Sequence, residues 1–320
     1  MVLALAIFVL LTRGPEPPKP NPPGTFSFAV LGDAPYFEWE DIQFPLVLKA
    51  LDQNDLSFII DVGDIFWEPC SDAMYQKTFN RLSNLRHPVI YTPGDNEWTD
   101  CWQPDAGEYS PLERLAKIRE IFFSNPTRSL GQNPLSLETQ STNEPFHEFV
   151  ENARWVYEGI VFATVNIVGS KNANAKFDKR TEADNEASRL RTEAAAAWVR
   201  ETFAKAKALN ANAVVLSFHA NADLEKPDSD YHHWFEPFLT SVEEETERFP
   251  KPVLLAHGDG HIYTVDQPMV RRTTGQLLEN LTRLQVPGSP RVGWVRVFVT
   301  QGPETRFSFE NHVVPRWKYW

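Results

Sequence analysis

The sequence lacks any block of basic residues. Its 320 residues carry 31 Lys and Arg against 43 Asp and Glu, a formal net charge of -12. Because binding to the nucleic-acid backbone depends on clustered positive charge, this balance argues against a nucleic-acid duplex as the main partner. No G-x-G-x-x-G follows the first predicted strand, which disfavours a dinucleotide-binding enzyme.

A hydrophobic run long enough to cross a bilayer is also missing. Residues 1–11 are mostly apolar, about half the length that a membrane-spanning helix needs. They fit the apolar part of a signal peptide, although no Lys or Arg precedes them and no clear A-x-A cleavage site follows. An uncleaved anchor and a start further upstream are alternatives. The Pro-rich stretch 15–23 is typical of an extended tether.

We therefore expect residues 1–24 to be an export or anchor segment with a tether. The protein would then be exported, in the periplasm, outside the cell or tethered to a membrane through its N-terminus. The alternative is a disordered N-terminus of a cytosolic protein.

Cysteine is scarce, with only Cys70 and Cys101 in the chain. Each comes shortly after a predicted strand, at the same edge of the predicted sheet. A disulfide between them is geometrically plausible and fits an exported protein. The alternative is two unrelated buried thiols.

Gly-Asp pairs, in contrast, are frequent. The 15 Gly and 17 Asp would form about 0.8 such pairs at random, but the chain has four. They place Asp33, Asp64, Asp95 and Asp259 directly after the predicted strands 26–31, 57–62, 89–92 and 253–256. Carboxylates gathered at one sheet edge repel each other unless positive charge lies between them. A pair of metal ions is the simplest candidate.

The order of elements predicts the fold class. The first three of these strands alternate with predicted helices at 43–52, where Pro45 would lie in the first turn, and 72–85, which indicates a parallel sheet. Further elements are predicted as a helix at 112–123, two antiparallel strands within 155–168, a long helix at 182–209, a strand at 213–218, a helix at 231–247 and strands at 293–300 and 306–309. The whole predicts two sheets with helices outside, in one domain over residues 25–320.

The motifs resemble those of a known family. The order Gly-Asp, Gly-Asp, Gly-Asp-Asn-Glu, a strand-end histidine and Gly-Asp-x-His resembles the calcineurin-like metallophosphoesterases over residues 26–265. The resemblance implies an α/β fold, a four-layer αββα sandwich of two mixed sheets. It also implies hydrolysis of phosphate mono- or diesters by a two-metal site with a bridging hydroxide. The substrate would be a phosphorylated small molecule or another ester. Carboxylate and histidine ligands suit Mn, Mg, Ca, Zn or Fe.

The resemblance also assigns residues to the site. Asp64 would bridge the two divalent ions, and Glu97 would support the metal ligands. Asn96 would donate to a non-bridging oxygen of the substrate, and His257, which the family pattern does not place, is a candidate for the general acid. The metal ligands predicted are Asp33, Asp64, Asp95, His219, Asp259 and His261; the catalytic residues predicted are Asn96, Glu97 and His257.

The sequence departs from the family pattern at five positions. Histidines of the family are replaced by Pro35, Asn96 and Asp259. Asp95 stands at the asparagine position, and Trp67 stands where the family has an acid. Tyr36 or a water would have to replace the first missing ligand. These departures keep a second hypothesis open, a binding protein of the same fold that holds one metal or none and has no turnover. Taken singly, each aspartate could also be a helix cap, and His219 a buried structural histidine.

Overall fold

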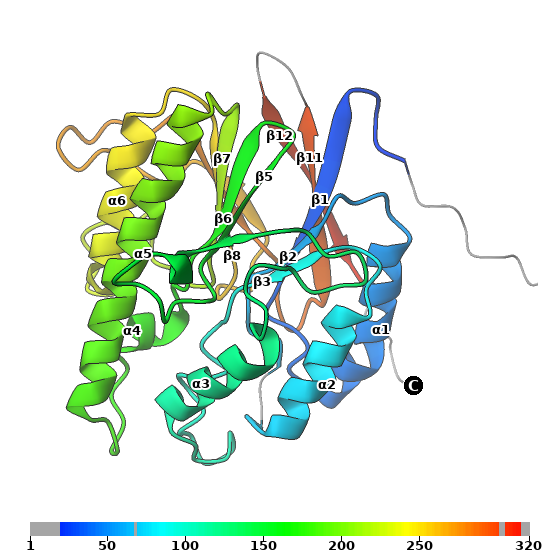
Figure 1. The fold of residues 1–320 in the computed structure, drawn as a ribbon, viewed down its shortest axis with the longest axis vertical. Coiled ribbons are helices and arrows are strands. Elements are labelled where there is room, and N and C mark those ends of the chain that lie inside the picture. Colours follow the sequence, from blue (N-terminus) through cyan, green and yellow to red (C-terminus); the bar gives the residue numbers. More distant parts are fainter. Residues whose placement is uncertain (1–19, 67–68, 301–304, 315–320) are drawn as a thin grey trace, which may run out of the picture.

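The computed structural model describes residues 20–66, 69–300 and 305–314. It confirms the predicted fold class, since two mixed sheets pack face to face with helices on their outer sides (Figure 1). Most of the predicted export segment, and Trp67, lie outside the described residues, and the assignment of residues 25–320 to a single domain stays a prediction. In the part of the chain that is described, no helix has both the length and the apolar character needed to span a membrane.

The first sheet has five strands in the order β12-β11-β1-β2-β3. Strands β1, β2 and β3 are parallel, whereas β11 and β12 are antiparallel to their neighbours. Its elements and outer helices are β1 (Thr25–Leu31), β2 (Ile59–Asp61), β3 (Val89–Tyr91), β11 (Gly293–Thr300), β12 (Arg306–Val313), α1 (Glu38–Asp52), α2 (Asp72–Ser83) and α3 (Pro111–Phe122).

The second sheet has seven strands in the order β4-β5-β6-β7-β8-β10-β9. Strands β6, β7, β8 and β10 are parallel, and β4, β5 and β9 are antiparallel to their neighbours. Its strands are β4 (Glu138–Thr139), β5 (Ala153–Tyr157), β6 (Ile160–Thr164), β7 (Ala213–Ser217), β8 (Val253–His257), β9 (Thr264–Asp266) and β10 (Leu281–Gln285). The helices α5 (Glu182–Ala208) and α6 (Glu236–Glu247) cover its outer face, and 3-10 turns lie at Gln140–Thr142 and His232–Phe235.

Aromatic side chains fill the space between the sheets. Phe28 of β1 stacks on Phe58 with ring centres 5.2 Å apart, and Phe58 meets Phe162 of β6 edge to face at 5.0 Å. All three are fully buried. Because the central strands β2, β3, β6, β7 and β8 are buried on both faces, they read as nearly continuous apolar runs in the sequence.

Two predictions about elements were wrong. Helix α1 begins at Glu38, so Pro45 lies in its interior and not in its first turn. The Glu40 carboxylate accepts hydrogen bonds from the backbone N–H of Tyr36, at 2.7 Å, and of Phe37, and so starts the helix earlier. Strands β4, β9 and β10 were not predicted. The sequence of β10 gives little strand signal, because Thr282 is its single β-branched residue, and its pairing with β8 and β9 makes it a strand.

Candidate metal centre

The carboxyl ends of five strands from both sheets meet at one edge of the sandwich. Asp33 follows β1, Asp64 follows β2 and Asp95 follows β3, while His219 follows β7 and Asp259 follows β8. All but Asp259 are less than 9% exposed. The fold therefore brings together five of the six residues predicted as metal ligands, as parallel strands with a common edge require.

Two groups of these side chains are compact enough to hold a metal ion. The first is Asp33, Asp64 and His219, and the second is Asp95, His219 and Asp259. Within each group the ligand atoms lie within 4.8 Å of one another. His219 is common to both groups, whereas Asp64, the predicted bridging ligand, belongs to the first.

His219 is oriented as a metal ligand would be. Its Nδ1–H donates to the carbonyl of Val62 at 2.8 Å, which leaves the lone pair of Nε2 facing the carboxylates. Nε2 lies 2.9 Å from Asp95 Oδ1 and 3.3 Å from Asp64 Oδ1. Two electron-rich atoms at 2.9 Å repel each other unless a cation, either a proton or a metal ion, lies between them.

The electrostatics of the cluster indicate a lack of positive charge. Burial raises the pKa of Asp33 to about 7 and that of Asp259 to about 6, since neighbouring carboxylates add to the cost of desolvation. Burial lowers the pKa of His219, but the facing carboxylates, chiefly Asp64 and Asp95, outweigh burial and raise it well above its usual value. The site therefore attracts cations.

The buried polar atoms give a further test of whether the residues fit a metal. Asp33 Oδ2 and Asp95 Oδ1 are inaccessible to solvent and accept no hydrogen bond from the described residues. Buried acceptors of this kind are rare in native proteins and need a partner. Divalent cations bind carboxylate and imidazole donors, so the residues present fit the two predicted ions.

His261 lies beside the first group. Its Nε2 is 3.6 Å from Asp33 Oδ1, and its Nδ1–H donates to the carbonyl of Ser289 at 2.8 Å. The free Nε2 therefore points to the carboxylate, as expected for a ligand. His257 does not join either group: it is fully buried, stacks on Phe218 with ring centres 5.4 Å apart, and burial lowers its pKa to about 3. Its catalytic role stays a prediction.

Asn96 and Glu97 lie next to the cluster in different ways. The backbone N–H of Asn96 donates to Asp64 Oδ1 at 3.0 Å, and its buried side-chain Nδ2 donates to no acceptor among the described residues. Glu97 Oε1 accepts from the backbone N–H of Ile65 at 3.2 Å and of Gly94 at 3.3 Å. Glu97 thus ties the loop after β2 to the loop after β3, which fixes Asp64 relative to Asp95.

Two glycines of the motifs are needed for close packing. A Cβ at Gly94 would lie 2.1 Å from Asp64 Oδ1, and one at Gly258 would lie 2.4 Å from Asp33 Oδ2. These two glycines therefore make room for the carboxylate of another motif. Gly63 is needed for its backbone conformation as well, since its φ is 94°.

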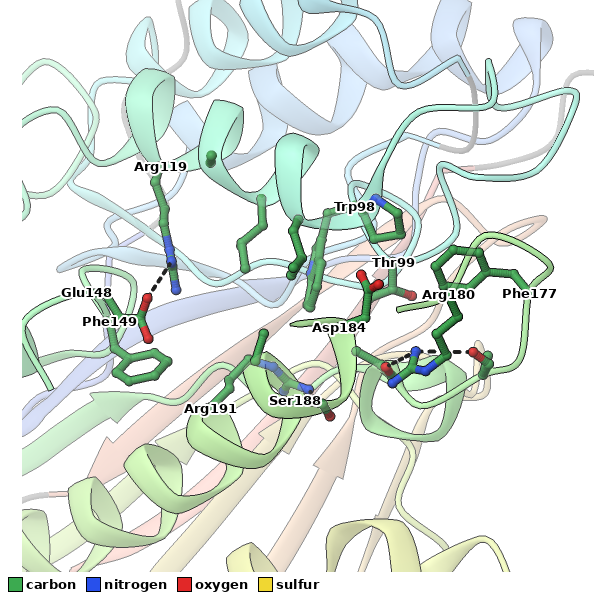
Figure 2. A pocket seen from close by; sticks show the side chains of 17 residues that line it. Trp98, Thr99, Arg119, Glu148, Phe149, Phe177, Arg180, Asp184, Ser188 and Arg191 are labelled. Carbon is green, nitrogen blue, oxygen red and sulfur yellow. Dashed lines mark hydrogen bonds and ion pairs between the residues drawn. The ribbon is translucent and has the colours of Figure 1, made fainter. Parts of the chain in front are cut away.

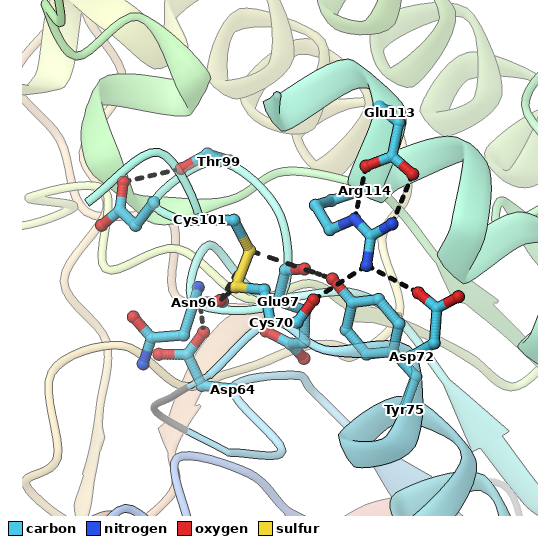
Figure 3. Close-up of a disulfide and its surroundings, with 11 residues drawn as sticks. Asp64, Cys70, Asp72, Tyr75, Asn96, Glu97, Thr99, Cys101, Glu113 and Arg114 are labelled. Carbon is cyan, nitrogen blue, oxygen red and sulfur yellow. Dashed lines mark hydrogen bonds and ion pairs between the residues drawn. A yellow bond between two sulfur atoms is a disulfide. The ribbon is translucent and has the colours of Figure 1, made fainter. Parts of the chain in front are cut away.

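The disulfide predicted between Cys70 and Cys101 is present, with Cα atoms 5.7 Å apart (Figure 3). It joins the loop after β2 to the loop that carries Asn96 and Glu97. Arg114 donates to the carbonyl of Cys70 at 2.8 Å and to Asp72, and the Tyr75 hydroxyl donates to the carbonyl of Glu97 at 2.5 Å. These contacts hold one wall of the site.

Several residues at the site carry no motif. The Tyr36 hydroxyl donates to Asp64 Oδ2 at 2.5 Å, near the position of the missing histidine. Ser170 donates to Asp95 Oδ2 at 3.1 Å and to Asp100, and burial together with Asp95 raises the pKa of Asp100 to about 7. The backbone N–H of Asn221 donates to Asp259 Oδ2 at 2.8 Å. Tyr36 could be found from its place beside Pro35, whereas Ser170, Asp100 and Asn221 lie in loops without a recognisable signal.

Ser170 belongs to a short turn in an uncommon conformation. The segment α4 (Gly169–Ala173) has left-handed backbone angles, with φ of 47°, 58° and 53° at Ser170, Lys171 and Asn172. Such a turn is unfavourable for L-residues and persists only when its surroundings hold it. The guanidinium of Arg191 does so by donating to the side chain and the carbonyl of Asn172, both at 2.6 Å.

The sandwich of two mixed sheets is the fold that the motif resemblance implied, and the candidate metal ligands lie at the ends of its strands. Among solved structures, the chain is similar to PhoD, with a TM-score of 0.55 and 11% identity over 91% of this chain and 69% of that one. A second structure, of a protein provisionally named a 5'-nucleotidase from Staphylococcus aureus in complex with alpha-ketoglutarate, matches with a TM-score of 0.45 and 11% identity over 92% of this chain and 55% of that one. No protein-family model and no curated protein sequence matches this chain.

Proposed function

We propose that the protein is a metal-dependent hydrolase of phosphate esters. The observation that carries the proposal is the convergence of Asp33, Asp64, Asp95, His219 and Asp259 on one buried point, with acceptor atoms that lack partners. A protein that needed these residues only for stability would pair or hydrate each of them.

The residues have distinct roles in the proposed site. Asp33 and Asp64 would hold one divalent ion and Asp95 and Asp259 the other. His219 has only Nε2 free, because its Nδ1–H is donated to Val62, so it would complete one of the two groups, and His261 would be able to join the first. Divalent ions held there would lower the pKa of water and balance charge on the phosphoryl oxygens. The Tyr36 hydroxyl lies at Asp64 and could supply the oxygen ligand that replaces the missing histidine.

The chain's own groups then act on the substrate. The buried Nδ2–H of Asn96 is available to donate to a non-bridging phosphoryl oxygen, which orients the ester. Glu97 keeps Asp64 and Asp95 in register through the two loops that it joins. His257, fully buried against Phe218, would need to move to reach a leaving group, so a direct role for it is the least supported part of the proposal.

Turnover of p-nitrophenyl phosphate and of its bis ester tests the proposal. We expect hydrolysis with Mn²⁺ and loss of at least 100-fold in kcat on chelation or in Asp64→Asn. Asp55→Asn is the matched control, since Asp55 is exposed and lies before β2, at the opposite end of that strand. Unchanged turnover in Asp64→Asn would refute the assignment.

The second candidate is a binding protein with the same fold and no turnover. Pro35 and Asn96, which stand at histidine positions of the family pattern, favour it. Neither ester would then be hydrolysed with any divalent ion tested, although inorganic phosphate could still bind. Activity toward either ester with any of the ions excludes this candidate.

A further inference from the structure

A cavity lies between α3, α5 and the left-handed turn (Figure 2). Its volume is about 220 Å³. None of the residues of the two metal-binding groups lines it. Thr99 and Ala173 of the left-handed turn belong to the wall of the cavity. Their neighbours Asp100 and Ser170 are hydrogen bonded to each other and lie between this wall and the candidate metal centre.

Three arginines line this cavity, and within the described ranges only Arg119 is paired with a carboxylate. Arg119 is paired with Glu151 through two contacts, at 2.7 and 3.0 Å. Arg180 donates only to neutral oxygens, including the carbonyls of Ala173 at 2.9 Å and Ala175 at 3.3 Å.

Arg191 is almost fully buried and likewise has no carboxylate within ion-pair distance among the described residues. Its guanidinium donates to the carbonyl of Asn166 at 3.0 Å as well as to Asn172. Burial lowers its pKa to about 9, so it is still a cation at neutral pH. Its nearest compensating charge is Glu151, which already pairs with Arg119, and an anion closer to the guanidinium would relieve more of the cost of burial.

The acidic residues of the wall compensate this charge only in part. Asp184 accepts from the backbone N–H and hydroxyl of Thr181 at 2.8 and 2.6 Å, where it caps α5, and Glu148 lies 3.9 Å from Arg119 on an exposed side chain. Glu148 and Glu151 both face Arg119 and Asp184 is set against Arg180, so Arg191 has only Glu151, which it shares with Arg119, as a compensating charge. The Nε–H of Arg191 is buried and donates to no acceptor among the described residues, so an anion in the cavity would find an unused donor there.

The rest of the lining is apolar. It comes from both helices, the left-handed turn and two loops, and consists chiefly of Leu112, Leu115, Ala173, Ala187, Phe149 and Phe177. Such walls suit an apolar body better than a heavily hydrated anion such as free phosphate. We propose that this cavity binds a small monocarboxylate with an apolar body, its carboxylate toward Arg180 and Arg191.

Calorimetric titration of the full-length protein with benzoate tests this proposal. We expect saturable binding to the wild type, and binding at least tenfold weaker in Arg180→Gln, because a charge-assisted hydrogen bond is lost. Ala187→Leu, which fills the cavity with a good helix former, should abolish binding. Arg189→Gln is the control, since Arg189 lies on the exposed face of α5 and pairs there with Glu186 and Glu193.

Benzyl alcohol, the neutral analogue, separates charge recognition from filling of an apolar space. Weaker binding of benzyl alcohol than of benzoate supports the proposal. Equal binding of the two compounds, no saturable benzoate binding to the wild type, or wild-type affinity in folded Arg180→Gln and Ala187→Leu would overturn it. Thermal unfolding of each variant establishes that it is folded.

Discussion

The disulfide between Cys70 and Cys101 provides a stability prediction with a magnitude that follows from the structure. The two residues are 31 positions apart. The chain-entropy relation for cross-links then gives a loss of about 3.7 kcal/mol in the free energy of unfolding when the bond is absent. That is a large share of the 5–15 kcal/mol typical of a folded protein. The reduced protein should therefore unfold at clearly lower urea concentration.

The assay is urea unfolding followed by far-UV circular dichroism, with and without a reductant that opens the bond. Reduced wild type is the matched comparison, because it keeps every side-chain atom and changes only the cross-link. The double variant Cys70→Ala, Cys101→Ala should have a lower free energy of unfolding than the reduced wild type, because both cysteines are fully buried and their packing is lost as well. A difference below about 1 kcal/mol between oxidised and reduced wild type would refute the reasoning.

Three further predictions concern the site and its surroundings. Gly258→Ala should weaken Mn²⁺ binding at least tenfold in calorimetric titration, because its Cβ would lie 2.4 Å from Asp33 Oδ2; unaltered binding would show that this contact is not needed. Tyr36→Phe should weaken Mn²⁺ binding roughly tenfold, since Asp64 loses its hydroxyl partner, and an unchanged dissociation constant would contradict this role. Burial lowers the pKa of His87, so the unfolded chain binds a proton there more readily than the native state. The stability of the protein should therefore fall as the pH drops below about 6.5. Urea midpoints measured from pH 7.5 to 5.5 should fall less in His87→Gln than in the wild type, and an equal fall in both would exclude the effect.

The sequence predicted the meeting of the Gly-Asp motifs because each pair follows an apolar strand. Strands that run parallel share a carboxyl edge, so Asp33, Asp64 and Asp95 had to come close once the alternation of strands and helices was recognised. The same argument extended to His219 and Asp259 of the second sheet, because the family resemblance placed both sheets in one sandwich.

The sequence could not predict what the loops contribute. Ser170 reaches Asp95 only because its left-handed turn is held by Arg191, about 20 residues further along the chain, and that contact has no local signal. Gly94 is required by the carboxylate of Asp64, which follows another strand, and the local sequence around Gly94 does not show that contact. Such contacts between distant segments are set by packing, and local patterns do not encode them.

The metal content of the purified protein tests the central claim most directly. After incubation with Mn²⁺ and removal of excess ions, mass spectrometry of the metals should find about two divalent ions per chain. His219→Ala should hold fewer, because one of the two ligand groups then loses its imidazole ligand, and Asp55→Asn should match the wild type. A wild-type protein that retains no divalent ion under these conditions would contradict the account.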